Sequence, residues 1–150
     1  MSDHLPPPAP GAAASLPASV RAFLDAPRFA VVATHDPDGV PHQAVAWYRL
    51  LEDGIVLNSA AGRRWPENLR RDPRVAVAIA DGYDWVGLRG IVEMIEDQDR
   101  AQADIAEMAR RYHADDPEKA ERLIADQFRR QRRISFLLRP ASIHAEIEGA

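Results

Sequence analysis

Two adjacent arginines and a tryptophan, Arg63, Arg64 and Trp65, follow a run of small residues and open the charged segment 59–73. The segment predicts a loop that leads into a helix, and the start of a helix offers free backbone N–H groups at a positive dipole end. Guanidinium groups add paired donors that suit phosphate or carboxylate. The segment is therefore a candidate anion-binding site. One alternative stays open, that its arginines only solvate a surface helix and balance neighbouring acids.

Aromatic side chains gather on or beside the predicted strands around this segment. They are Trp47, Tyr48, Trp65, Tyr83 and Trp85. A planar ring could stack among them, because aromatic faces favour offset stacking. The alternative is that each fills the core or a dimer contact.

Other catalytic schemes lack their residues. The chain has no cysteine, and it has neither a G-x-S-x-G nor an H-E-x-x-H motif. Its five histidines are scattered without the spacing of metal ligands: His4, His35, His42, His113 and His144. No catalytic side chain is identified from the residues alone. An anion site beside aromatic rings favours a protein whose cofactor supplies the chemistry.

Composition narrows the class of protein further. The formal net charge of -4 argues against bulk nucleic-acid binding, which needs a basic surface. No apolar run reaches the roughly 20 residues of a membrane helix, and no secretory signal opens the chain. With no cysteine to form disulfides, we expect a cytoplasmic protein. A length of 150 residues is typical of one domain.

Hydrophobic periodicity predicts the elements that position these residues. Residues 1–15, rich in Pro and Ala, read as a disordered tail, and residues 16–150 as the folded domain. The predicted helices are a short one before residue 27, then 65–72, 97–112 and 118–132. In the first of them Val20, Phe23 and Leu24 stand at helical spacing. The predicted strands are 29–35 and 40–50 around a turn, 55–60, 74–80, 83–95 and 134–147. Closure of six antiparallel strands into a small barrel removes exposed edges, so we predict a mainly β fold with inserted helices.

A family resemblance rests on four segments that occur in order. They are FAVVATHDPDGVPHQAVAWY, GIVLNSAAGRRWPENLRRDPRVAVAI, WVGLRGIVEMIED and RISFLLRPASIHA. Over about residues 16–147 the chain resembles the pyridoxamine-phosphate-oxidase-like split-barrel superfamily. The stretch NLRRDPRV, with arginines before it, resembles the actinobacterial branch of deazaflavin (coenzyme F-420)-dependent oxidoreductases.

The resemblance implies a six-stranded split barrel, a homodimer with two interface cofactor sites, and hydride transfer between F-420 and a small unsaturated or quinone-like substrate. By position, the cofactor phosphate would be held by Arg63, Arg64, Trp65 and Asn68. The ring would be flanked by Val45, Ala46, Trp47, Asn58, Ser59 and Ala60. Trp65 stands near a position where many relatives carry lysine, so that phosphate contact would be either missing or replaced by Arg64. Two alternatives stay open: an FMN-dependent oxidoreductase of the same fold, or a non-catalytic module that binds flavin or haem.

Overall fold

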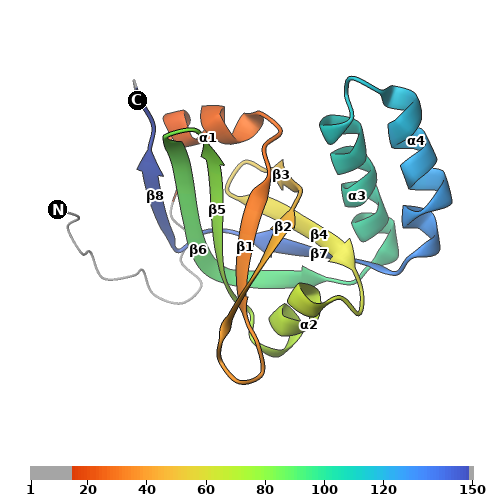
Figure 1. Ribbon diagram of the computed structural model, residues 1–150, viewed down its shortest axis with the longest axis horizontal. Helices are drawn as coiled ribbons and strands as arrows, with labels where there is room; N and C mark the ends of the chain where they lie inside the picture. Colours follow the sequence, from red (N-terminus) through yellow and green to blue (C-terminus); the bar gives the residue numbers. More distant parts are fainter. Residues whose placement is uncertain (1–14, 149–150) are drawn as a thin grey trace.

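The computed structural model describes residues 15–148 (Figure 1). The predicted tail over residues 1–15 lies outside this range except for its last residue. The strands are β1 (Ala30–His35), β2 (Pro41–Ala46), β3 (Tyr48–Leu50), β4 (Ile55–Ala60), β5 (Arg74–Asp81), β6 (Asp84–Ile95), β7 (Arg133–Leu138) and β8 (Ser142–Glu146). The helices are α1 (Ala18–Asp25), α2 (Arg64–Arg71), α3 (Gln98–Tyr112), α4 (Pro117–Asp126) and the 3-10 turn η1 (Phe128–Arg130).

The strands form one antiparallel sheet in the order β2-β1-β5-β6-β7-β4-β3, with β8 paired to β6. The two ends of this path, β2 and β3, are joined in the chain by Trp47 alone. The sheet therefore curls until its ends approach one another, as Figure 1 shows. This arrangement confirms the predicted mainly β architecture with inserted helices.

The predicted number of strands, six, is wrong: the described residues form eight. The second predicted strand divides at Trp47, because β2 pairs with β1 whereas β3 pairs with β4. The last predicted strand divides around Pro140, with β7 pairing to β4 and β8 to β6. Proline has no N–H to give a ladder, so it ends one pairing before the next begins.

The long strand β6 passes from one side of the sheet to the other. It pairs with β5 up to Ile91 and with β7 from Val92 onward. At Gly90 a Cβ atom would lie 3.0 Å from the side chain of Leu138 and close to the backbone of residues 139–141. Glycine permits this close approach of the backbone, and β6 curves strongly in Figure 1.

Two apolar cores hold the helices. The interior of the curled sheet packs against α1 through Val20, Phe23 and Leu24, the three residues predicted from helical spacing. A second core joins α3 and α4 to the outer surface of β4 and β7, and Figure 1 shows this helix pair beside the sheet. No helix within residues 15–148 combines the length and apolar character needed to cross a membrane.

Local signals set the ends of the helix pair. Asp97 caps α3 by accepting a hydrogen bond from the backbone N–H of Arg100, and Asp116 caps α4 in the same way. The predicted helix 118–132 is too long, because α4 ends at Asp126. At Gln127 the backbone leaves helical geometry (φ -120°, ψ -62°), and the chain then turns through η1 into β7.

Candidate functional site

A pocket of about 350 Å³ lies where the curled sheet meets the α3–α4 pair. Strands β2, β4 and β7 and the start of α2 contribute to its walls, together with α3, α4 and η1. Seven of the ten predicted site residues line it: Val45, Ala46, Trp47, Asn58, Ser59, Arg63 and Trp65. The chain segments around residues 45 and 60 therefore meet as the resemblance implied.

The other three predicted residues do not line the pocket. Ala60 lies buried in β4 opposite Arg133. Arg64 forms an ion pair with Asp36, and Asn68 donates hydrogen bonds to Thr34 Oγ1 (3.1 Å) and Asp36 Oδ1 (3.0 Å). The hydrogen bonds from Arg64 and then Asn68 lower the pKa of Asp36 to about 2. Arg64 and Asn68 thus tie α2 to the β1–β2 turn.

The two adjacent arginines point apart because they occupy different backbone positions. Arg63 is the extended N-cap of α2 (φ -72°, ψ 160°), and Arg64 is its first helical residue. The backbone N–H of Gly62, in the loop before the helix, already bonds to the Glu67 carboxylate (3.2 Å). Arg63 thus reaches the pocket while Arg64 does not, and the prediction of a paired grip is not reproduced.

A second arginine enters the pocket from β7. Arg133 is 3% exposed, and its Nε donates to Asn58 Oδ1 at 3.0 Å. Its guanidinium also donates to Gln131 Oε1 (2.6 Å) and lies 4.9 Å from the centre of the Phe128 ring. No carboxylate of residues 15–148 forms an ion pair with it. Burial, and then the charge of Arg63, lower the pKa of Arg133 to about 10, so it remains a cation at neutral pH.

Ser59 presents a buried hydroxyl donor without an acceptor. Its hydroxyl is buried, and no group of the described residues forms a hydrogen bond with it. Arg63 likewise has no carboxylate partner among residues 15–148. A buried donor without a partner costs roughly 1–3 kcal/mol. Two cations and a free hydroxyl on one pocket wall therefore fit an anionic group.

A buried polar network holds Arg133 in place. Asp104 is fully buried in α3, and it accepts hydrogen bonds from Arg49 (3.1 Å), Arg100 (2.8 Å) and Ser135 Oγ (2.7 Å). The same Ser135 oxygen accepts from Asn58 Nδ2 at 3.0 Å. Because Asn58 in turn accepts from Arg133, the network links α3 to the pocket cation.

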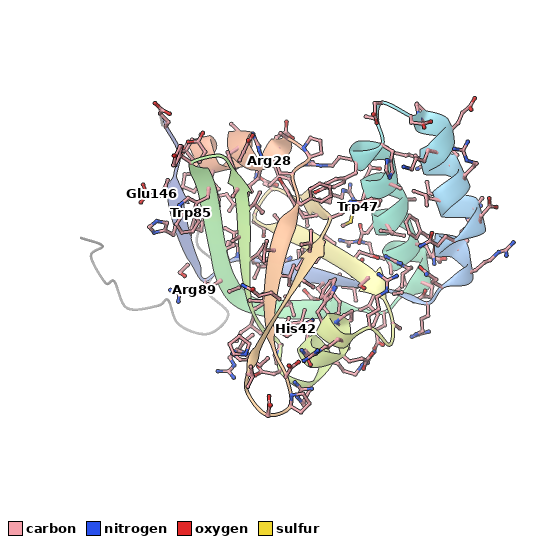
Figure 2. The ribbon with its side chains drawn as sticks, viewed as in Figure 1. Arg28, His42, Trp47, Trp85, Arg89 and Glu146 are labelled. Carbon is pink, nitrogen blue, oxygen red and sulfur yellow. The ribbon has the colours of Figure 1, made fainter. Side chains whose placement is uncertain are left out.

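Aromatic rings form the apolar wall. Trp47 stacks on Tyr112 with ring centres 5.1 Å apart, and it meets Phe128 edge-on at 6.3 Å. Figure 2 shows Trp47 between the sheet and α3. Trp65 lines the pocket while packing on Phe136 in the core. The remaining predicted aromatics lie elsewhere: Tyr48 in the core, Tyr83 in the exposed β5–β6 turn and Trp85 against His144.

Sequence reasoning missed the other half of the pocket lining. These residues are Phe29, Ile105, His113, Leu123, Gln127, Phe128 and Arg133. For Arg133 a signal existed, because an arginine at the head of the apolar run RISFLL is unusual in a buried strand. Phe29 directly precedes β1, and the others lie on or next to α3, α4 and η1, which only tertiary packing brings to the sheet. Within residues 15–148 no three metal-ligating side chains lie together.

Solved structures of other proteins share this fold. Three solved structures are similar. A conserved hypothetical protein from Mycobacterium tuberculosis has a TM-score of 0.73 at 23% identity, with 90% of this chain and 86% of that chain covered. An F420 reductase has a TM-score of 0.67 at 21% identity, with 85% of this chain and 98% of that chain covered. The haem storage protein HutZ from Vibrio cholerae has a TM-score of 0.63 at 19% identity, with 88% of this chain and 95% of that chain covered. At such identities the likeness shows a shared fold.

A search of the curated proteins found no match. The family model described as pyridoxamine 5'-phosphate oxidase matches residues 16–144. This range runs from α1 into β8 and so includes every element around the pocket. The chain therefore belongs to the pyridoxamine 5'-phosphate oxidase family.

Proposed function

We propose that the protein is a cytoplasmic oxidoreductase that binds reduced coenzyme F-420 in this pocket and passes hydride to a small unsaturated or quinone-like substrate. The observation that carries the proposal is a set of donors beside the ring of Trp47. Arg63 and Arg133 have no carboxylate partner among residues 15–148, and the Ser59 hydroxyl has no hydrogen-bond partner there. In a molecule that joins a phosphate to a flat ring, the phosphate can pair with these donors while the ring packs against Trp47. The F420 reductase of similar fold supports the deazaflavin over other flat molecules.

Each part of the pocket has a role in this proposal. Arg63, Arg133 and the Ser59 hydroxyl hold the phosphate, since charge-assisted hydrogen bonds are the stronger kind. The wall of β2 and Trp47 flanks the ring. Side chains of α3, α4 and η1, among them Ile105 and Phe128, exclude water from the opposite side. The cofactor supplies the hydride when bound.

Two alternatives use the same pocket. FMN carries both a phosphate and a flat ring, so an FMN-dependent oxidoreductase would use the same donors. A non-catalytic module for flavin or haem is the other alternative, and the similarity to a haem storage protein favours it. Haem carboxylates would pair with the two arginines.

Parallel titration of the purified protein with F-420, FMN and haemin tests the proposal. Binding is followed by fluorescence for the two flavin-like molecules and by absorbance for haemin. We expect F-420 to bind most tightly, and reduced F-420 to be oxidised when 2-cyclohexen-1-one or menadione is added. Tighter binding of FMN would favour the second enzyme, and haemin binding without F-420 binding would contradict both enzyme functions.

We further propose a homodimer that buries the outer face of the sheet. This face carries exposed apolar residues where a soluble monomer carries polar ones. Val31 lies opposite Val45 on one side and Ala78 on the other, and Ala78 lies opposite Gly87. All four are partly or largely exposed and continue toward the exposed Ile91. Val45 also lines the pocket, so a second copy on this face would cover the pocket mouth.

Sedimentation equilibrium tests the dimer. We expect a species of twice the 16.7 kDa chain mass, and we expect Val31→Glu to shift it toward the monomer because a carboxylate would be buried. Val40→Glu is the matched control, since Val40 is exposed in the β1–β2 turn outside this face. A wild-type monomer at micromolar concentration would contradict the proposal.

A further inference from the structure

His113 brings a proton-exchanging group to the pocket. It is the C-cap residue of α3, and its ring meets Trp47 edge-on with centroids 5.5 Å apart. The pocket lining contains three ionisable side chains, Arg63, His113 and Arg133. Of these three side chains, imidazole is the one whose chemistry suits proton transfer to a substrate.

Aromatic side chains connect the pocket arginine Arg133 to the imidazole of His113. The Arg133 guanidinium lies over Phe128 at 4.9 Å, and the Phe128 ring meets Trp47 at 6.3 Å. Trp47 then meets His113. The rings of Phe128 and Trp47 therefore link Arg133 to His113 through successive contacts. A flat molecule whose anionic group pairs with Arg133 would extend along these rings toward His113.

Tyr112, next to His113 in the chain, also carries an acidic proton, but its hydrogen bonds make it unsuitable as a proton donor to a bound molecule. Its hydroxyl accepts a hydrogen bond from the backbone N–H of Tyr48 (3.1 Å) and donates to the carbonyl of Arg28 (2.5 Å). Burial raises the pKa of Tyr112 to about 12. The imidazole of His113, in contrast, forms no hydrogen bond with the side chains or backbone of residues 15–148.

We propose that His113 is the proton donor to an α,β-unsaturated ketone reduced in this pocket, an inference that rests on the proposed function. Hydride from the reduced cofactor forms a C–H bond at the β-carbon of the ketone. The alkene π pair shifts toward the carbonyl carbon, and the carbonyl π pair moves to oxygen. That oxygen takes the N–H proton of the His113 imidazolium, which leaves an enol and a neutral imidazole. Solvent returns the proton to His113, and the enol converts to the saturated ketone.

A binding test needs no turnover. With oxidised F-420 bound, 4-nitrophenolate presents a flat ring and an anionic oxygen that resembles the enolate oxygen, and its absorption band reports binding. His113→Phe keeps a flat ring beside Trp47 but has no N–H donor. We expect the variant to bind 4-nitrophenolate at least tenfold more weakly, because a hydrogen bond to a charged group is lost. We expect the dissociation constant for F-420 to change less than threefold.

Turnover of 2-cyclohexen-1-one supplies the second test. General acid catalysis contributes about 10²- to 10⁴-fold, so kcat of His113→Phe should fall at least a hundredfold. Added imidazole should restore part of the rate of His113→Ala, which a purely structural role would not permit. His42→Gln is the control, since Figure 2 shows His42 toward the β1–β2 turn and away from Trp47.

The outcomes separate the two proposals. Equal affinity of wild type and His113→Phe for 4-nitrophenolate would overturn the role of His113, as would an unchanged kcat or a His113→Ala loss that imidazole does not restore. A wild-type protein that fails to bind F-420 would instead overturn the proposed function. If His113→Ala does not fold, the His113→Phe results decide.

Discussion

Replacing Arg63 by alanine and Arg133 by methionine together should weaken F-420 binding by more than about a hundredfold. Both guanidiniums line the pocket, and neither is neutralised by a carboxylate of residues 15–148. One charge-assisted contact contributes about 1.5–3 kcal/mol, and a tenfold change in affinity corresponds to about 1.4 kcal/mol. Fluorescence titration of the wild type and the double variant measures the ratio of their dissociation constants.

Arg64→Ala is the matched control, since Arg64 is adjacent in sequence but pairs with Asp36 outside the pocket. It should leave the dissociation constant within about twofold, because a rim charge contributes little. The double variant should remain folded. Asn58 Oδ1 loses its donor Arg133, but removal of a buried charge also removes its desolvation penalty, which offsets that loss. A larger loss in Arg64→Ala than in Arg63→Ala would contradict this site.

Asp104→Ala should lower the free energy of unfolding by about 2–3 kcal/mol. The carboxylate is fully buried and accepts from Arg49, Arg100 and Ser135. Loss of one partner of a buried ion pair costs roughly 3–5 kcal/mol. We expect a loss below this range, because the side chains of Arg49 and Arg100 are 38% and 41% exposed and regain water. Urea denaturation measures the difference.

Asp99→Ala provides the comparison on the same helix. Asp99 is exposed in the first turn of α3, so its removal should change stability by less than about 0.5–1 kcal/mol. Asp104→Ala should also weaken F-420 binding, since the link through Ser135 and Asn58 to Arg133 is broken. Equal stability of the two variants would show that the buried network does not hold the pocket.

The order of strands and helices could be predicted from the sequence because its signals are local. The turn around Gly39 needs a positive φ, observed at 87°, and the β-branched runs on both sides form β1 and β2. The spacing of Val20, Phe23 and Leu24 predicted the buried face of α1. The strand count could not be predicted in this way, because partners far along the chain divide one extended run into β2 and β3.

For the site, the family resemblance of the sequence implied that an arginine and small polar residues around positions 58–65 would meet Trp47, and they line one pocket. Tertiary structure alone decided which arginine enters it. Arg63 and Arg64 are equivalent in composition, but the N-cap geometry of α2 and the position of Asp36 send them apart. Arg133 and His113 come from β7 and the end of α3, some 70 and 50 residues after Arg63. No local sequence pattern predicts that Arg133 and His113 lie in the same pocket as Arg63. Pairing of β7 with β4 and packing of α3 on the sheet bring them there.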